Sequence, residues 1–382
     1  MSFASSPFEL PDLSQPQRLL GGLSAQAFMT TVWQRRPMVI RQAIDVEGLL
    51  PSRREMFALA KREDVESRWI HDDVRRGWTL RHGPIARTPK LSTPKCSLLV
   101  QGVDLHDDRA RALMERFRFV PDARLDDVMM SWASEGGGVG PHTDRYDVFL
   151  LQVEGSRRWS IAPPADYAWV AGLPLRIIDG FEPQESFDLA PGDMLYLPPM
   201  WAHDGVAHGG ECITCSIGFT VPQADDLARE LVLRSSEHWE DEALYEDPDQ
   251  AATPEPASVP RALQTFARQA LKRMLQEPQA LHCALGEWLT EPKAQVWFEP
   301  SDSVWGQGDV ALDRKTRMLY DAQHVFINGE AFQARGHDAR CLRGLANRRR
   351  MAATVLDSMT ADAQAVLAQW HELGWIHTTS RA

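Results

Sequence analysis

Residues 136–144 read GGGVGPHTD, and an apolar run at residues 146–153 follows them directly. In an extended segment, residues i and i+2 point to the same face, so His142 and Asp144 can present an imidazole and a carboxylate to one point in space. The glycines before them let the backbone pass close to a ligand, and the run after them is typical of a buried barrel strand. This stretch therefore predicts two of the ligands of a metal site.

A third metal ligand is expected from residues 188–208, which read DLAPGDMLYLPPMWAHDGVAH. In this segment a Pro-Gly-Asp turn starts an apolar strand, and two prolines end that strand close to His203. Two histidines and one carboxylate on one face of a metal, with the other positions open, is the arrangement that non-haem Fe(II) oxygenases use. We therefore expect His203 to join His142 and Asp144. His208 precedes a Gly-Gly turn and is expected to lie outside the site.

A resemblance to a known family rests on three segments, namely HTDRYDVFLLQVEGSRRW at residues 142–159, PGDMLYLPP at residues 191–199 with the histidine that follows it, and CSIGF at residues 215–219. These segments resemble the JmjC-type cupin oxygenases. More narrowly, the chain is similar to the bacterial ribosomal oxygenases that hydroxylate an arginine of the sixteenth protein of the large ribosomal subunit. The resemblance covers most of the chain and is most specific at residues 126–219. It implies a double-stranded β-helix and a dioxygenase that uses Fe(II) and the cosubstrate 2-oxoglutarate to hydroxylate a protein side chain.

Residue by residue, the resemblance identifies His142, Asp144 and His203 with the iron ligands. It identifies Arg157 with the basic residue that holds the distal carboxylate of 2-oxoglutarate. Arginine suits this task, because its planar fork can bind a carboxylate through two charge-assisted hydrogen bonds and stays charged at any working pH. Arg158 should point to the opposite face of the same strand, where we expect a solvated charge.

Residues 212–219 are expected to form the last barrel strand. By the resemblance, Ser216 matches a position close to the cosubstrate, and Thr214 shares its face. Cys212 and Cys215 lie in the same strand pattern with C-x-x-C spacing. Because residues i and i+3 on a strand face opposite sides, we interpret both as packed thiols and not as a zinc or redox pair.

Composition and charge limit the class of protein. The chain has 382 residues, of which 43% are hydrophobic, and no run approaches the ~18 consecutive apolar residues that a membrane span needs. Five cysteines argue against a disulfide framework, and the N-terminus lacks the pattern of a secretory signal, so we expect a cytoplasmic protein. The formal net charge of -12 makes direct nucleic-acid binding unexpected, but it is compatible with a basic ribosomal protein as substrate.

The order of helix and strand signals predicts a mainly β fold with α-helices, in three parts. Residues 1–222 are expected to form a JmjC/cupin jelly roll, because short strands separated by turns dominate and helices collect at the front. Within this part, Ser24 should cap a helix, residues 38–40 should form a strand, and a polar turn at Asp72 and Asp73 should separate two further strands.

Residues 223–291 are expected to be helical. On residues 261–276 the apolar positions form a continuous stripe at helical spacing. Such a stripe often packs within its own chain. Since the family that the chain resembles uses these helices to dimerise, we favour a homodimer interface.

Residues 292–382 are expected to form a small α+β domain that resembles a winged helix. It should contain a strand at residues 318–327, followed by a turn at the Asn-Gly pair. The three arginines at residues 348–350 could form a phosphate patch. We interpret them as a solvated helix end, because a nucleic-acid module would usually show a broader basic face.

Two other interpretations remain open at this level. A zinc or nickel cupin that acts as an isomerase or hydrolase would need the same three ligands but no counterpart of Arg157. A catalytically silent cupin would use its helical parts as a binding scaffold, although the intact triad counts against it. The target residue is open as well: the resemblance implies arginine, whereas hydroxylation of lysine, histidine or asparagine would need the same iron site.

Overall fold

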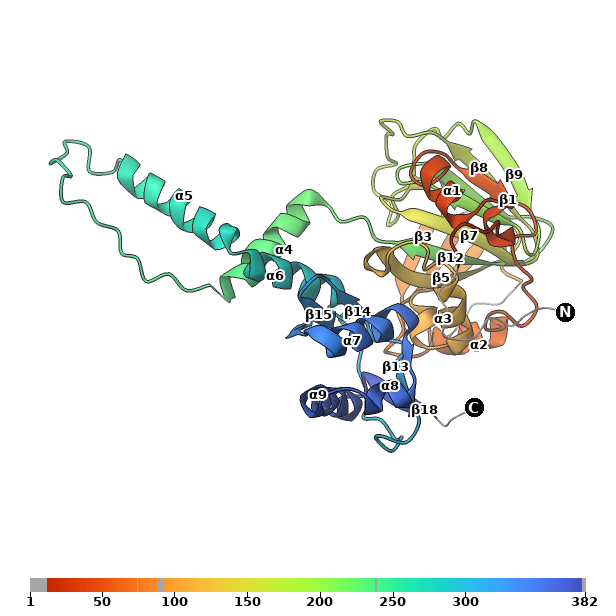
Figure 1. The fold of residues 1–382 in the computed structure, drawn as a ribbon. Helices are drawn as coiled ribbons and strands as arrows, with labels where there is room; N and C mark the ends of the chain where they lie inside the picture. The colour runs from red at the N-terminus through yellow and green to blue at the C-terminus, as the bar shows by residue number, and fades with distance from the viewer. Residues whose placement is uncertain (1–11, 74, 88–91, 238, 380–382) are drawn as a thin grey trace. The chain divides into compact units, whose positions relative to one another are not determined.

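The computed structural model describes residues 12–73, 75–87, 92–237 and 239–379, which fold as two compact units. The first unit ends at Val221 and the second begins at Pro222 (Figure 1). Antiparallel sheets dominate the first unit, while helices and small sheets make up the second. The predicted fold class, a mainly β jelly roll followed by helices and a small α+β part, is confirmed.

The N-terminal part of the first unit consists of helices and short strands. In chain order they are η1 (Arg18–Leu20), α1 (Ala25–Thr31), β1 (Met38–Ile40), α2 (Arg53–Leu59), β2 (Ser67–Asp73), β3 (Gly77–His82), β4 (Cys96–Val100), η2 (Val103–Leu105), α3 (Asp108–Glu115) and η3 (Asp122–Arg124). Ser24 caps α1 as predicted, because its hydroxyl accepts a hydrogen bond from the Ala27 amide at 3.1 Å. The strand predicted at residues 38–40 is β1.

The turn predicted at Asp72 and Asp73 was wrong. Both residues belong to β2, whose pairing with β3 continues until Asp73 lies opposite Gly77. The Asp73 carboxylate accepts hydrogen bonds from the backbone amides of Arg75 and Arg76, at 2.8 and 3.0 Å. An aspartate at the last strand position therefore organises the turn that follows it without being part of it.

Two antiparallel sheets make up the jelly roll. Its other strands are β5 (Leu125–Ala133), β6 (His142–Thr143), β7 (Asp147–Glu154), β8 (Arg157–Ala162), β9 (Glu185–Leu189), β10 (Met194–Leu197), β11 (Ala202–Ala207) and β12 (Cys212–Phe219). The larger sheet has the order β1-β10-β7-β12-β5-β4-β2-β3, and the smaller sheet has the order β6-β11-β8-β9. Helices α1 and α3 cover the outer face of the larger sheet (Figure 1).

Strand β7 is buried from Asp147 to its penultimate residue because it has an apolar layer on each face. On the outer face, Phe149 packs against Phe28 of α1 and Tyr196 of β10, with ring centroids 5.5 and 4.9 Å apart. On the inner face, Leu150 joins a separate cluster that includes Trp159 of the smaller sheet. Each large side chain buried in this way contributes about 1.5–3 kcal/mol. The two layers explain the unbroken apolar run in the sequence.

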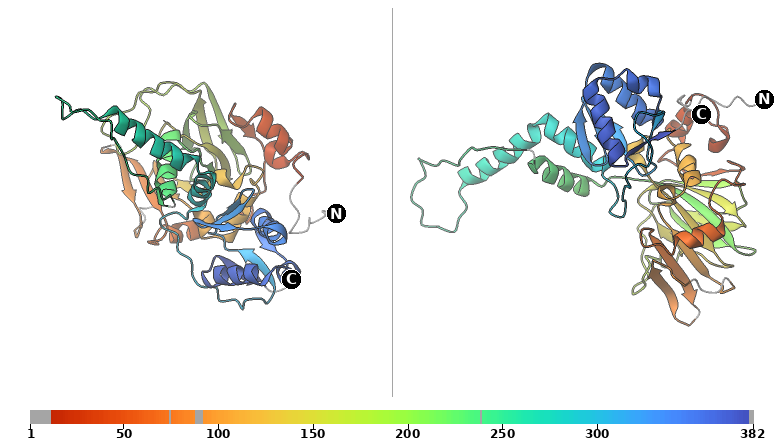
Figure 2. Two further views of the ribbon diagram at one scale, coloured as in Figure 1. Left: turned by 60° about the vertical axis from the view of Figure 1, so that its left-hand side comes forward. Right: turned by 90° about the horizontal axis from the view of Figure 1, so that it is seen from below.

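Three helices open the second unit, and a small α+β domain follows them. Its elements are α4 (Ala224–Glu237), α5 (Arg261–Gln276), α6 (Pro278–Thr290), β13 (Asp309–Leu312), β14 (Met318–Tyr320), β15 (His324–Ile327), β16 (Glu330–Gln333), α7 (Gly336–Arg348), β17 (Arg350–Met351), α8 (Ala353–Asp357), α9 (Ala361–Glu372) and β18 (Ile376–Thr379). Strand β13 lies between β17 and β18, and β15 lies between β14 and β16. Helix α5 extends away from the rest of its unit (Figure 2). No helix within the described residues has the length and apolar character needed to cross a membrane.

The single strand predicted at residues 318–327 is a hairpin of β14 and β15. The chain turns there because the Asp321 carboxylate accepts hydrogen bonds from the amides of Gln323 and His324, at 2.7 and 2.6 Å. The predicted Asn-Gly turn is confirmed. Its two residues have φ angles of 49° and 89°, and it joins β15 to β16.

The three arginines at residues 348–350 do not share one environment. Arg349 ends α7 with a left-handed φ of 56° and is only 7% exposed. Its guanidinium donates hydrogen bonds to the carbonyl oxygens of Thr316 and Asp313, at 3.0 and 2.6 Å. The prediction of a solvated helix end was therefore wrong for Arg349, because the left-handed turn directs this side chain toward buried carbonyls. Arg348 and Arg350, on either side of it, are exposed.

Candidate metal and cosubstrate site

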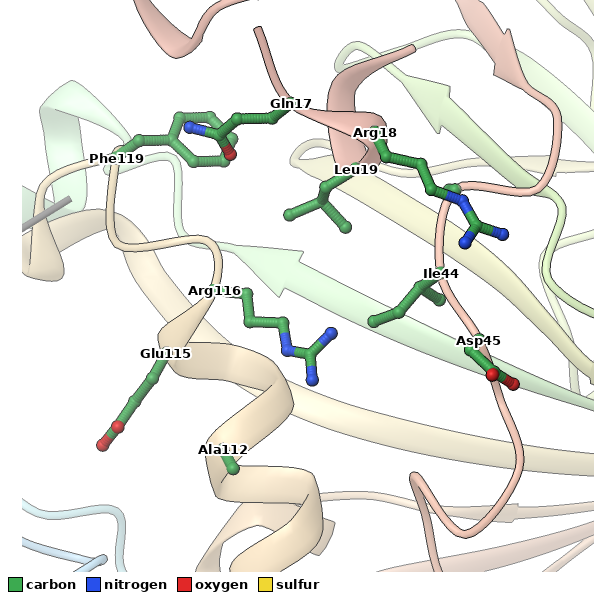
Figure 3. A pocket seen from close by; sticks show the side chains of 10 residues that line it. Gln17, Arg18, Leu19, Ile44, Asp45, Ala112, Glu115, Arg116 and Phe119 are labelled. Atoms are coloured by element: carbon green, nitrogen blue, oxygen red, sulfur yellow. The ribbon is translucent and has the colours of Figure 1, made fainter. Parts of the chain in front are cut away.

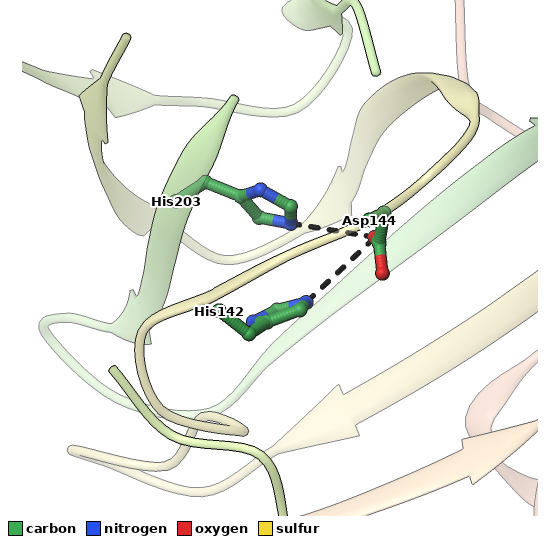
Figure 4. A group of neighbouring side chains, drawn as sticks. All are labelled: His142, Asp144 and His203. Carbon is green, nitrogen blue, oxygen red and sulfur yellow. Dashed lines mark ion pairs between the residues drawn. The ribbon is translucent and has the colours of Figure 1, made fainter. Parts of the chain in front are cut away.

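Three side chains that can bind a metal converge where β6 meets β11. The strands pair so that His142 lies directly opposite His203. The Nε2 atoms of these histidines lie 3.7 and 3.6 Å from Oδ2 of Asp144, which follows β6 (Figure 4). All three candidate ligand atoms lie within 4.8 Å of one another. The structure therefore brings together the three residues that the sequence predicts as ligands.

The glycine-rich loop before β6 brings His142 close to β11. The loop exchanges backbone hydrogen bonds with Ala207 of β11, which accepts from Gly136 at 3.0 Å and donates to Gly137 at 2.9 Å. A Cβ atom at Gly138 would lie 2.6 Å from the carbonyl oxygen of Gly205. Since side chains cannot fit between the two segments, the glycines are required for this approach.

Backbone carbonyls orient both histidine rings. Nδ1 of His142 lies 2.9 Å from the Gly140 carbonyl oxygen, and Nδ1 of His203 lies 2.9 Å from the Trp201 carbonyl oxygen. A carbonyl oxygen can only accept, so each Nδ1 carries the proton and each Nε2 presents its lone pair toward Asp144. Burial and, to a smaller extent, the neighbouring His142 lower the pKa of His203 to about 4, although Asp144 partly opposes the shift. His203 is therefore neutral at pH 7, which is the state that a metal ligand requires.

Arg157 lies on the inner face of β8, on the same side of the sheet as the triad. In the pairing of β8 with β11, Ile161 is opposite His203 and Arg157 is opposite Ala207, so these positions share one face. Arg157 is 5% exposed, and its guanidinium lies 5.6 Å from the ring of Trp159. The Trp159 ring in turn lies 5.9 Å from the His203 ring.

Arg158 points away from this interior, as the strand alternation predicts. Its guanidinium makes two hydrogen bonds to the Asp188 carboxylate, at 2.8 and 2.9 Å, and both side chains are about half exposed. The two adjacent arginines therefore differ in a way that matters for chemistry, because only Arg157 carries its charge into the barrel.

The interior around Arg157 fits an anionic ligand. Among the described residues, Nε and Nη2 of Arg157 have no hydrogen-bond partner, and Nη1 reaches only the Ser131 hydroxyl at 3.5 Å. A buried cation with unpaired donors is costly unless an anion accompanies it. A dicarboxylate that reaches from the histidine and aspartate side chains to this guanidinium would supply that anion. The residues present thus fit both a divalent metal and 2-oxoglutarate.

Polar side chains on β5, β7 and β12 line up beside Arg157. Thr214 and Ser216 are buried on one face of β12. Thr214 lies opposite Ser131 of β5 and donates a hydrogen bond to Gln152 of β7 at 2.9 Å. Ser216 forms no hydrogen bond with a described residue and so has a free hydroxyl. Sequence reasoning missed Ser131 and Gln152, although a glutamine within an apolar strand is a signal that could have identified one of them.

The other cysteine and histidine predictions agree with the structure. Cys212 and Cys215 are buried free thiols that belong to two different apolar clusters, and burial raises the pKa of Cys215. His208 is exposed. Neither cysteine nor His208 belongs to the group of metal-binding side chains found among the described residues.

A separate cavity of about 610 Å³ lies on the same unit between residues 17–19, residues 43–45 and α3 (Figure 3). The Arg116 side chain points into it (Figure 3). None of the predicted site residues lines this cavity. We therefore assign neither the metal nor the cosubstrate to it.

Two family models match the chain. A model described as "JmjC domain" matches residues 112–227, and a model described as "ROXA-like winged helix" matches residues 262–377. The first match contains every residue of the candidate site described above. The second contains nearly all of α5, all of α6 and most of the small α+β domain.

Relatives of known name are similar over much of the chain. "Ribosomal protein uL16 3-hydroxylase" of Escherichia coli is 32% identical over 321 residues, which are 79% of this chain and 84% of the relative. "Probable ribosomal oxygenase" of Haemophilus influenzae is 33% identical over 210 residues, which are 54% of this chain and 52% of the relative.

Solved structures of ribosomal oxygenases have the same fold as this chain. The X-ray structure of E. coli ycfD aligns with a TM-score of 0.82 and 28% identity, covering 91% of this chain and 96% of that one. A structure of the E. coli ribosomal oxygenase YcfD in complex with cobalt and 2-oxoglutarate aligns with a TM-score of 0.79 and 28% identity, covering 93% and 98%. Together with its sequence identity to the E. coli hydroxylase, this likeness shows that the chain belongs to the JmjC-type ribosomal oxygenase family.

Proposed function

We propose that the protein hydroxylates an arginine side chain of a large-subunit ribosomal protein. As a member of its family, it is a 2-oxoglutarate-dependent hydroxylase whose cofactors are Fe(II) and 2-oxoglutarate. The observation that carries the proposal is the placement of the unpaired Arg157 guanidinium on the same inner face as His203. The name of the E. coli relative, a uL16 3-hydroxylase, supports a ribosomal protein as substrate.

In this proposal His142, Asp144 and His203 hold the iron. The hydrogen bonds from each Nδ1 to a carbonyl fix the ring orientations, so that no reorganisation is needed when the metal binds. When bound, Fe(II) and 2-oxoglutarate supply the activation of dioxygen, with succinate and CO2 as coproducts. Three protein ligands leave the remaining coordination positions to cosubstrate and dioxygen.

Arg157 would bind the distal carboxylate of 2-oxoglutarate through its two unpaired donors. Ser216 would donate a further hydrogen bond to the cosubstrate. Its hydroxyl is buried on the inner face and not used elsewhere, whereas the Thr214 hydroxyl is already engaged with Gln152. Trp159, between Arg157 and His203, would keep water away from the reacting atoms.

We also propose that the protein is a cytoplasmic homodimer, because a ribosomal protein substrate would be met in the cytoplasm and α5 offers an apolar surface. Leu263, Leu271 and Leu275 of α5 are 37%, 48% and 39% exposed. Contiguous exposed leucines are typical of an interaction site. A division into an oxygenase domain (1–222), a dimerisation region (223–291) and a winged-helix-like domain (292–382) follows from this assignment.

The function is tested with purified protein, Fe(II) and 2-oxoglutarate. Succinate formation should increase when the ribosomal protein is added, and mass spectrometry should find the mass of one added oxygen atom on an arginine. Addition of the oxygen atom to a lysine, histidine or asparagine would support the oxygenase activity but would show that the target residue is not arginine. A wild-type protein that forms no succinate with any ribosomal protein would contradict the proposal.

A further inference from the structure

A pocket of about 470 Å³ in the second unit combines arginine side chains with an apolar floor. It lies between α7, β17 and α8, of which Figure 1 labels the two helices. Arg340, Arg348 and Arg350 line it, and Leu345 and Met351 are among the apolar residues of its floor. The pocket belongs to one unit and shares no residue with the metal site.

The pocket follows from the spacing of residues on α7. His337, Arg340, Gly344 and Arg348 recur every three or four residues, so they lie on one face of the helix. A Cβ atom at Gly344 would lie 3.1 Å from Nη1 of Arg348, which means that the Arg348 guanidinium lies back over the glycine, toward Arg340. The glycine thus leaves room for a cation on the helix surface.

The buried Arg349 determines where its two neighbours point. Since its left-handed backbone directs its own side chain inward, Arg348 at the end of α7 and Arg350 at the start of β17 both remain on the exposed side. The three consecutive arginines therefore supply one structural cation and two cations to the pocket. Arg340, about two helical turns before Arg348, broadens this basic face beyond what the triplet alone indicates.

Two of the arginines that line the pocket, Arg340 and Arg350, lack an anionic partner among the described residues. No acidic side chain lines it. Asp338, the acidic residue of the first turn of α7, accepts hydrogen bonds from the Thr360 amide and hydroxyl instead, at 3.1 and 2.7 Å. The guanidiniums of Arg340 and Arg350 form no ion pair or hydrogen bond with a described residue. A local cationic surface thus exists on a chain whose net charge is -12.

We propose that this pocket binds a nucleic-acid strand, with its phosphates on the arginines and a sugar or base on the apolar floor. Arginine forks suit phosphate oxygens, and the floor gives a nucleoside an apolar contact that a bare anion would not need. Along the axis of α7, Arg340 and Arg348 are about 12 Å apart at their backbones, which is wider than one phosphoserine spans and leaves room for more than one phosphate of a strand. This inference is independent of the proposed hydroxylase function.

The test uses the full-length protein and fluorescence anisotropy with a labelled single-stranded RNA and a DNA of the same sequence. Arg340→Gln/Arg350→Gln should weaken binding roughly tenfold and lower the slope of log K against log salt by about 1.4, which is about 0.7 for each lost phosphate contact. The matched control, Arg268→Gln/Lys272→Gln, removes the same charge from exposed positions of α5 and should bind like the wild type. Comparing the affinities for RNA and DNA shows which of the two nucleic acids the pocket prefers.

Three outcomes would overturn the proposal. These are no saturable binding of either strand by the wild type, an equal loss in the control variant, and tighter binding of a phosphoserine peptide than of either strand. Equal melting temperatures of all variants would show that a loss of binding is not a loss of folding. Because the readout is binding, and because hydroxylation of an isolated substrate protein should be unchanged in Arg340→Gln/Arg350→Gln, failure here is distinguishable from failure of the proposed function.

Discussion

Adjacent arginines on β8 offer a test in which each is the other's control. Arg157→Ala should raise the KM for 2-oxoglutarate roughly 10- to 100-fold while iron binding persists, because charge-assisted hydrogen bonds to the distal carboxylate are lost. Arg157→Lys should recover part of the loss, since it keeps the charge but not the fork. Steady-state kinetics of succinate formation and a separate titration with Fe(II) measure the two effects.

Arg158→Ala provides the comparison. Its side chain forms an exposed ion pair with Asp188, which contributes little, so the KM for 2-oxoglutarate should change less than about twofold. Normal kinetics in Arg157→Ala together with impaired kinetics in Arg158→Ala would show that the cosubstrate lies on the other face of the strand.

Removal of a metal ligand should separate activity from folding. Asp144→Ala and His203→Ala should each abolish 2-oxoglutarate turnover and weaken Fe(II) binding, while the melting temperature of the metal-free protein stays within a few degrees, because the apolar clusters are built from other residues. His208→Ala, at an exposed position five residues further along, should remain fully active. Activity in His203→Ala with loss in His208→Ala would reassign the third ligand.

The sequence predicts these residues unequally well, for a physical reason. His142 and Asp144 are two residues apart, so local backbone geometry alone places them on one face. Ser131 and Gln152 come together with Thr214 only through the register of β5, β12 and β7, which is a long-range property. Such pairings depend on strand order, and no single segment encodes them.

Among the elements, the turn before β10 connects three parts of the jelly roll through one carboxylate. Asp193 is almost buried and accepts hydrogen bonds from the Arg41 guanidinium at 2.6 Å, the Gln42 amide at 2.9 Å and the Ala190 amide at 3.2 Å. Burial alone would raise the pKa of Asp193, but these donors together lower it below the ordinary value of 3.8. Asp193→Asn should therefore destabilise the protein at pH 7 by about 1–3 kcal/mol.

The sign of the pH dependence follows from the lowered pKa. A carboxyl whose pKa is lower in the folded state stabilises the fold above its unfolded pKa, and this contribution is lost as the pH falls through the folded value. The difference between wild type and Asp193→Asn in urea unfolding should thus be full at pH 7 and shrink below pH 3.8. Asp188→Asn, which changes an exposed carboxylate, should differ little from wild type at either pH. A constant difference across this range would contradict the ionic role of Asp193.

Element boundaries illustrate what periodicity can and cannot predict. The apolar run of β7 and the stripe of α5 are long enough to identify a strand and a helix. The run at residues 318–327 is equally apolar but contains Asp321, whose carboxylate closes a turn that hydrophobicity does not reveal. Asp73 likewise accepts hydrogen bonds from the turn that follows β2. In both places the position of the turn depends on a single aspartate, which is why the two predicted boundaries were wrong.

For the whole molecule, the exposed stripe of α5 is where the proposed dimer can be tested. Leu271→Glu should convert dimers to monomers, because the new carboxylate would be buried in apolar surroundings without a partner. Lys272→Glu, at the neighbouring exposed position, should leave the dimer intact. Light scattering gives the mass in solution, and a wild-type protein that is monomeric at micromolar concentration would remove the dimer hypothesis without any variant.

Net charge proved a poor guide to the surface of the whole molecule. The value of -12 is a sum over the chain, and it does not indicate that Arg340 and Arg350 meet around one pocket. That grouping depends on the inward turn of Arg349, which only the folded backbone determines. The fold class and the grouping of His142, Asp144 and His203 could be predicted from the sequence, whereas this basic face could not.

The proposed binding of 2-oxoglutarate by the unpaired donors of Arg157 predicts inhibition by the product succinate. Succinate keeps the carboxylate that the guanidinium would bind and loses only part of the metal-chelating end of 2-oxoglutarate, so the product should compete with the cosubstrate for the same buried cation. We expect the inhibition constant of succinate to rise in Arg157→Ala in parallel with the KM for 2-oxoglutarate. The rate of hydroxylation would then follow the ratio of the two dicarboxylates, which links modification of the ribosome to the balance of central carbon metabolism.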